Sequence, residues 1–394
     1  MLPLENIKIL DLSRLAAGNM VSHMFADFGA DVVKVEKPGK GDDLRNWKIN
    51  GISHWWAVYS RNKRSISIDL KKDEGLALLK ELVKSADVFI ENFVPGTLEK
   101  WGIGPEQLAE LNKNLIILRI SGWGQTGIFK NAPGFGSLVE GMSGFAAMTG
   151  EEKQSPLLPP LALADMVAGL TGFGAILMAI LTSKKDNTGG QVIDLSLFEP
   201  FFSILGPWAA SYKISGKVPK RIGNRSNVAA PRGIYKTKDN KYVSLSASMQ
   251  SMWEKLALTI GSSDLIKDPR FLTNSDRLNN QDDLDKPISK FIKKYSREEV
   301  LNIFSKEGIT VGPVLDISEI IEHPYIQDRE VLIDHYNKEY GNVLMHQAFP
   351  RLSKTPGKIR HSAPSLGGDT DLVLKEIGIS EKQIQMLRKN KIIN

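Results

Sequence analysis

The hydrophobic pattern of the first half of the chain alternates between two spacings. Apolar runs with strand character recur at residues 7–12, 31–36, 65–70, 87–91, 115–121 and 191–197. The segments after the first and third runs instead place apolar side chains at helical spacing, and Gly29 stands where the first of these helices should end. Strands that alternate with helices predict a mostly parallel sheet with helices on both faces, an α/β fold.

The residue composition and the spacing of apolar residues change after Tyr212. An apolar helix is predicted over residues 198–212, and residues 213–232 are basic, rich in Gly and Ser, and typical of a linker. Residues 233–247 form two short alternating runs around Asp239 and Asn240, which predicts a β-hairpin. We therefore expect a large domain over residues 1–212 and a smaller α+β domain over residues 233–326.

Composition narrows the possible functions of the 394-residue chain. It has no cysteine, which excludes disulfides, cysteine-ligated metals and a thiol nucleophile within this sequence. The formal net charge of +6 is modest, so small anionic ligands are favoured over nucleic acid. The first residues lack the pattern of a signal peptide, and a cytoplasmic protein is expected.

Asp165 is the one charged residue between Lys153 and Lys184. The 17 residues 166–182 that follow it carry no charge, and they favour a buried helix rich in small residues over a membrane span. An unpaired carboxylate in an apolar segment costs several kcal/mol, so it needs a reason to be there. Two compatible interpretations remain: a helix N-cap, or a nucleophile or base.

Two familiar kinds of site are not predicted. Residues 122–127 satisfy the G-x-G-x-x-G pattern, but Pro133 and further glycines follow where a dinucleotide-binding helix should begin. A flexible loop near an active site is the preferred interpretation. The six histidines show no metal-ligand spacing, so no metal site is expected. Chemistry should then rest on carboxylates, basic residues, hydroxyls or the backbone.

Polar and basic residues follow several predicted strands. Asn92 and Phe93 come after residues 87–91, and Lys37 comes after residues 31–36. The carboxyl ends of strands in such a sheet form the ligand crevice. Basic residues close to those ends could meet a polyanionic ligand or could simply be solvated surface charges: Lys37, Arg64, Lys71 and Lys100.

Several longer segments together resemble the class III (CaiB/BaiF-type) CoA-transferases. They occur in the family's order over nearly the whole chain and comprise residues 4–18, 29–45, 62–71, 86–103, 120–127, 161–170, 268–280 and 366–380. The resemblance implies a Rossmann-like large domain, completed by a return segment at residues 327–394, together with a small domain. It also implies a homodimer of two interlocked chains.

The resemblance further implies an enzyme that moves CoA from an acyl-CoA donor to a small carboxylic acid, with no metal and no tightly bound cofactor. Asp165, in LALAD, takes the place of the family's nucleophile. The implied CoA contacts are Ala16, Ala17, Lys37, Ile68, Lys71, Asn92, Phe93, Lys100 and Phe135. No contact with nucleic acid or membrane is expected.

The sequence also departs from the family pattern. Lys100 stands where relatives commonly have Arg, Phe135-Gly136 replaces Tyr-Asp, and Glu140 replaces Gln. The mobile glycine-rich loop of formyl-CoA transferases has no counterpart around residues 246–251. Two alternatives stay open beside the transferase: a CoA-binding protein without catalysis, and a 2-methylacyl-CoA racemase. The racemase branch needs a histidine before the aspartate, and residues 120–164 contain none.

Overall fold

The computed structural model describes residues 1–186 and 188–394, which divide into two compact units. The large unit comprises residues 1–143, 159–206 and 327–394. The small unit comprises residues 144–158 and 207–326. The chain therefore passes from the large unit to the small one and back twice, and each unit contains segments that are distant in sequence.

A parallel sheet forms the centre of the large unit. Over the described residues it has six strands, in the spatial order β3-β2-β1-β4-β5-β6. The strands are β1 (Lys8–Asp11), β2 (Asp31–Glu36), β3 (Arg64–Ser67), β4 (Val88–Glu91), β5 (Ile116–Ser121) and β6 (Val192–Ser196). All neighbouring pairs are parallel. This confirms the predicted α/β fold class, and the strand order is that of a Rossmann fold.

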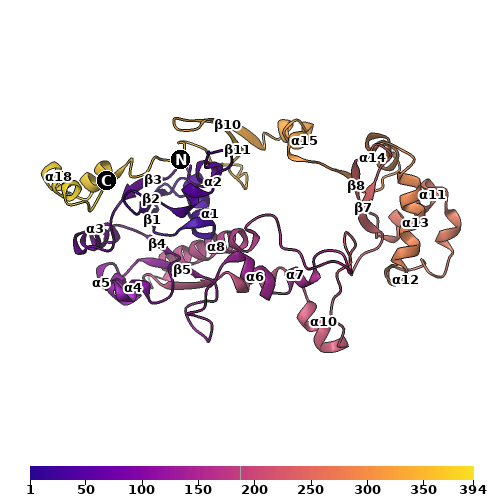
Figure 1. Cartoon of the computed structure of the whole chain (residues 1–394), viewed down its shortest axis with the longest axis horizontal. Coiled ribbons are helices and arrows are strands. Elements are labelled where there is room, and N and C mark those ends of the chain that lie inside the picture. The colour runs from indigo at the N-terminus through magenta and orange to yellow at the C-terminus, as the bar shows by residue number, and fades with distance from the viewer. Residues whose placement is uncertain (187) are drawn as a thin grey trace. The chain divides into compact units, whose positions relative to one another are not determined.

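Helices cover both faces of this sheet (Figure 1). On one face, α1 (Leu15–Asp27) packs on β1 and β2, and α8 (Leu163–Asp186) packs on β5 and β6. On the other, α3 (Asp73–Val83) and α5 (Pro105–Leu111) join an apolar cluster with the strands. The four inner strands are buried on both sides, which explains why their sequences are mostly apolar, whereas the edge strand β6 is partly exposed.

The return segment completes the second of these faces. Its helices α17 (Thr370–Glu376) and α18 (Glu381–Lys389) contribute Leu374 and Ile384 to the same apolar cluster. Ile392 and Ile393 are also buried there. The core under the first strands of the chain is therefore closed by residues that come more than 300 positions later in the sequence.

Shorter elements complete the large unit. The helices are α2 (His54–Tyr59), α4 (Thr97–Lys100), α6 (Gly136–Met142) and α9 (Phe198–Ser203), with a 3₁₀ turn at Asp43–Asn46. An antiparallel hairpin is formed by β10 (Leu332–Asn337) and β11 (Gly341–His346). The helix α16 (Pro324–Asp328) lies at the passage between the units.

The small unit has its own apolar core and a three-stranded antiparallel sheet, as counted among described residues. Its strands are β7 (Arg232–Lys236), β8 (Tyr242–Ser246) and β9 (Val311–Val314). The helices are α7 (Phe145–Met148), α10 (Trp208–Ser215), α11 (Gln250–Thr259), α12 (Asn274–Asn279), α13 (Gln281–Ile292), α14 (Arg297–Lys306) and α15 (Ile317–Ile321), with a 3₁₀ turn at Ser263–Ile266. The predicted hairpin is confirmed, with Asn240 at a φ of 61° in its turn.

One helix prediction was wrong. The expected single helix over residues 198–212 is two helices, α9 and α10. The break falls at Gly206, with a φ of 93°, and at Pro207, which has no N–H to continue the ladder of helical hydrogen bonds. The same point is the boundary between the two units.

The helix α8 begins earlier than the sequence suggested. It starts at Leu163, so Asp165 lies inside its first turn rather than in front of it. Residues Leu163–Lys185 are long and apolar enough to cross a membrane, although a third of the most apolar window is buried within the protein. That buried stripe packs on α1 and the sheet, while Met178 and Leu181 on the opposite stripe are exposed.

Candidate active site

Asp165 lies in a cavity of about 440 Å³ in the large unit. Three helices begin at this cavity: α1 at Leu15, α6 at Gly136 and α8 at Leu163. Helix N-termini present unpaired N–H groups and a partial positive charge, so this arrangement favours negative charge in the space between them. The loop before α6 forms one wall of the cavity, with Phe135 as its last residue.

The Asp165 carboxylate is half-buried and accepts hydrogen bonds from its own N–H and from that of Ala17, in the first turn of α1. Burial, followed by the charge of Glu140, raises the pKa of Asp165 to about 6 despite these bonds. A carboxylate with a raised pKa is poorly solvated and correspondingly reactive. The geometry therefore suits a nucleophile or base.

Gly136 permits the closest approach to Asp165. A Cβ atom at this position would stand 2.4 Å from the Oδ2 atom of Asp165, which no side chain could tolerate without displacement of the carboxylate. Its place in the Phe135-Gly136 pair, a departure from the family pattern, thus has a steric explanation. The main chain at the start of α6 lies directly against the carboxylate.

Asp165 is not the N-cap of α8, because Glu140 supplies the capping oxygen instead. Glu140 is 3% exposed, and its Oε1 atom accepts the N–H of Ala164 at 3.1 Å. Ala164 lies in the first turn of α8, where N–H groups have no partner within the helix. A side chain from α6 therefore caps α8, and Asp165 remains directed to the cavity.

The glycine-rich stretch at residues 122–127 is a loop, as predicted, and it is braced at both ends. The backbones of Gly122 and Gly134 lie in direct contact, and the Nε1 atom of Trp123 donates to the carbonyl oxygen of Pro133 at 2.9 Å. The N–H of Gln125 donates to the Asp194 carboxylate, at 3.0 Å from each oxygen. These contacts fix the loop, which forms part of the wall of the cavity around Asp165.

A second cavity, of about 310 Å³, lies at the carboxyl ends of β1, β2 and β3. Its apolar surface includes Leu12, Val35 and Ile68, and its rim carries Lys37 and Lys71. Arg14, Asp43 and Phe93 line both this cavity and that of Asp165. The two spaces are therefore neighbours, which suits one long ligand with a polyanionic end and an apolar end.

Most of the residues implied as CoA contacts line one or the other of these two cavities. Lys37, Ile68, Lys71 and Phe93 line the second cavity, and Ala17, Asn92, Phe93 and Phe135 line the first. Ala16 is buried beside Ala17 and Lys100 is exposed at the end of α4; neither is among the described residues that line the two cavities.

Asn92 has a structural contact that the sequence did not reveal. Its Oδ1 atom accepts the N–H of Arg14 at 2.8 Å, and its Nδ2 atom donates to the carbonyl oxygen of Arg14 at 2.7 Å. The side chain thus holds the residue just before α1. Arg14 itself was not predicted, although it follows the first strand closely; its guanidinium lies 5.5 Å from the Phe93 ring centre and 3.7 Å from Asp43.

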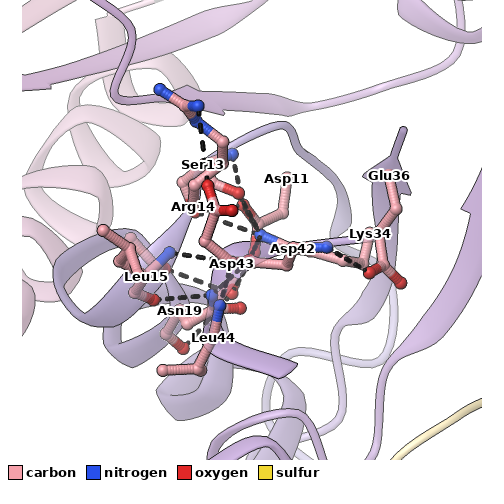
Figure 2. A network of polar contacts seen from close by, with 12 residues as sticks. Asp11, Ser13, Arg14, Leu15, Asn19, Lys34, Glu36, Asp42, Asp43 and Leu44 are labelled. Atoms are coloured by element: carbon pink, nitrogen blue, oxygen red, sulfur yellow. Dashed lines mark hydrogen bonds and ion pairs between the residues drawn. The ribbon is translucent and has the colours of Figure 1, made fainter. Parts of the chain in front are cut away.

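A buried network holds the start of α1 (Figure 2). The Nζ atom of Lys34 is fully buried, 3.2 Å from Asp11 and 3.0 Å from Asp42. Asp42 also accepts the N–H of Leu15 at 2.9 Å and bonds to Asn19 at 2.7 Å. Leu15 has a φ of 62°, a conformation that a leucine adopts only when its surroundings impose it. The network thus fixes the helix start that presents the N–H of Ala17.

Charge pairing decides the protonation of this network. Burial alone would lower the pKa of Lys34, but the carboxylates of Asp11 and Asp42 raise it above its ordinary value. Burial also dominates at Lys63, which lies 3.7 Å from Asp11, and lowers its pKa to about 7. Lys34 is therefore the charged partner that the two carboxylates require.

Comparisons with known proteins agree with the site. The model of CoA-transferase family III matches residues 4–370. The chain belongs to CoA-transferase family III. As a member of this family it is a CoA-transferase.

Relatives of known activity cover the whole length. The chain is 35% identical to the succinyl-CoA–D-citramalate CoA-transferase of Chloroflexus aurantiacus, over 99% of this chain and 98% of that protein. It is 32% identical to the succinyl-CoA:glutarate CoA-transferase of Homo sapiens, over 95% of this chain and 86% of that protein. A CaiB/BaiF family protein from Brucella suis has a similar crystal structure, with a TM-score of 0.84, 32% identity, and coverage of 95% and 99% of the two chains.

The network around Lys34 makes a testable contribution to stability. Lys34→Met leaves the buried Asp42 carboxylate without its cation and leaves Asp11 with Lys63 alone, 3.7 Å away, and we expect the free energy of unfolding to fall by about 3–5 kcal/mol. Lys40→Met is the matched control, because Lys40 pairs with Asp43 at 2.6 Å on the exposed surface. That change should cost less than about 1 kcal/mol. Urea unfolding followed by circular dichroism measures both, and equal losses would contradict the assignment.

Proposed function

We propose that the protein transfers CoA from succinyl-CoA to a second dicarboxylic acid, with Asp165 as the nucleophile. The observation that carries this proposal is the position of the Asp165 carboxylate, half-buried among three helix N-termini in a cavity that adjoins a second one. The relatives named above supply the donor, and citramalate and glutarate are both dicarboxylates. No step needs a metal or a resident cofactor.

The proposed reaction begins with attack of the Asp165 carboxylate on the thioester carbonyl of the donor. The carbon–sulfur bond breaks, and CoA leaves as a thiolate beside a mixed anhydride. The thiolate then attacks the Asp165 carbonyl, which releases succinate and leaves an aspartyl-CoA thioester. The acceptor carboxylate runs the two steps in reverse: it displaces the thiolate to form a new anhydride, whose acyl carbonyl the thiolate then attacks. Product acyl-CoA leaves, and Asp165 is again a free carboxylate.

The surroundings of Asp165 suit each of these steps. The N–H of Ala17 already bonds to the carboxylate and is placed to stabilise negative charge on the same oxygen when its carbonyl is attacked. A poorly hydrated pocket makes the carboxylate more reactive and protects anhydrides from water. The second cavity would hold the nucleotide end of CoA, with Lys37 and Lys71 near its phosphates. That remote binding energy keeps the thiolate in place between steps.

Two cations line the cavity of Asp165: Arg14 and Lys130, as counted among the described residues. A substrate with one reacting carboxyl group carries no second charge for them, whereas a dicarboxylate does. Arg14 is half-exposed and only loosely paired with Asp43. We therefore assign the distal carboxylate of the substrates to these two side chains.

An interlocked homodimer is part of the proposal, as the family resemblance implies. Several helices leave large apolar side chains exposed, a pattern typical of surfaces that pack in an assembly. On α8, Met178 is 65% and Leu181 is 68% exposed; on α6, Met142 is 54% exposed. A partner chain would cover surfaces of this kind.

Replacement of the nucleophile tests the reaction class. Asp165→Ala should abolish exchange of labelled CoA between acids while CoA affinity stays within about tenfold, because the carboxylate is not a main anchor of CoA. With the native enzyme, hydroxylamine and succinyl-CoA should give a hydroxamate on Asp165, detected by mass spectrometry. A variant that still exchanges CoA would overturn the proposal. A racemase would instead incorporate solvent deuterium at the α-carbon of the acyl group without an adduct.

Replacement of Arg14 tests the substrate class. Arg14→Gln should raise the KM of a dicarboxylate acceptor about 10–100-fold, because a charge-assisted hydrogen bond is lost. The KM of a monocarboxylate of the same length should change little. Lys113→Gln is the control, since this lysine is exposed and lines neither cavity. An equal increase for both acids would assign Arg14 to CoA binding instead.

The oligomeric state has a direct test. Native mass spectrometry should give twice the chain mass of 43.6 kDa. A double change to lysine at Met178 and Leu181 should shift the species toward one chain, since it places charge on the apolar stripe of α8. A native mass of 43.6 kDa with full activity would contradict the dimer.

A further inference from the structure

Glu140 has an ionisable carboxyl group that its structural task does not require. Its contact with the N–H of Ala164 needs only an oxygen acceptor, and the neutral amide of glutamine would supply one. A buried carboxylate costs several kcal/mol of desolvation unless a cation compensates for it. Within residues 1–186 and 188–394, no ion pair involves Glu140. The presence of a carboxyl group in place of an amide is therefore the feature to explain.

The charge of Glu140 acts on the nucleophile. Ala164, which Glu140 caps, is the residue directly before Asp165, and Gly136 of the same helix α6 touches the Asp165 carboxylate. Repulsion from Glu140 is the largest contribution of any charged neighbour to the raised pKa of Asp165. The two carboxylates thus repel each other across one turn of helix.

The other charged groups near Glu140 and Asp165 either face the substrate side of the cavity or have a hydrogen-bond partner of their own. Arg14, Asp43 and Lys130 line the same cavity, on the side open to substrate. The helix α9, which packs on both α6 and α8, brings Glu199, whose carboxylate accepts the hydroxyl of Ser196 at 2.7 Å. From α1, the main chain of Ala17 faces Asp165.

We propose that Glu140 is a positioning residue whose negative charge drives the capture of the acyl group by Asp165. The inference rests on the proposed function. When an Asp165 oxygen bonds to the acyl carbon and the carbon–sulfur bond breaks, the negative charge moves from Asp165 to the departing CoA sulfur. Repulsion between the two side chains then ends. The free enzyme is raised in energy relative to the anhydride and the aspartyl thioester, and repulsion from Glu140 contributes to this difference in addition to burial.

The variant Glu140→Gln tests this role, because it keeps the oxygen that caps α8 and removes the charge. In the native enzyme, kcat/KM should rise with pH through a midpoint near 6, as Asp165 loses its proton. In Glu140→Gln the midpoint should move down by about one pH unit, since a like charge has been removed. The fraction of enzyme held as aspartyl-CoA thioester during turnover, measured by intact mass after an acid quench, should also fall about tenfold.

Glu140→Ala separates capping from charge. It removes both the charge and the cap, so it should shift the midpoint as Glu140→Gln does and in addition lower the thermal stability. A purely structural Glu140 would give a Glu140→Gln enzyme with the native midpoint and the native thioester fraction. That result would overturn the inference.

The native enzyme provides a test that does not depend on the folding of any variant. A midpoint near 4 instead of 6 would show that Asp165 is not destabilised, and would also overturn the inference. Failure to trap any Asp165 adduct in the native enzyme is a different outcome, because it refutes the proposed function itself. The two failures are therefore distinguishable.

Discussion

One buried cation, Lys34, determines where the active site can form. It joins Asp11 at the end of β1 to Asp42 on the loop after β2, and Asp42 in turn holds Leu15 in a conformation that leucine does not adopt unaided. The first turn of α1 is then fixed against the sheet, with the N–H of Ala17 directed at Asp165. Together with the hydrogen bonds of Asn92 to Arg14, this constraint sets the alignment of the α1 N-terminus with α6 and α8, on which the anion site between the three helices depends.

Much of the fold could be predicted from the sequence because strands buried on both faces are mostly apolar. All six runs chosen on that basis lie in the large sheet, and the hairpin around Asn240 is signalled by its turn residues. The broken helix at Gly206 was missed because the surrounding residues remain apolar on both sides of the break. The local composition gives no sign that the chain passes from the large unit to the small unit at Gly206.

The site was only partly predictable for a related reason. Asp165 is conspicuous as a lone charge in an apolar segment, and residues at strand ends follow from the topology. The role of Glu140 as a cap for a helix some 20 positions further along the chain depends on the packing of α6 on α8, which no local pattern encodes. The same holds for Asn92, whose bonds to Arg14 join segments that are neighbours only in the folded sheet.

The closure of the large core by Ile392 and Ile393 has a consequence for biosynthesis. On the ribosome, the first strands emerge long before these residues exist, and the entire small unit is synthesised in between. The nascent large unit therefore leaves part of one apolar face of its sheet uncovered until Ile392 and Ile393 have been synthesised, while the small unit already has every residue of its own core. The core of the small unit is thus complete before the core of the large unit, although synthesis of the large unit begins first. Chaperones would be needed in the time between the two.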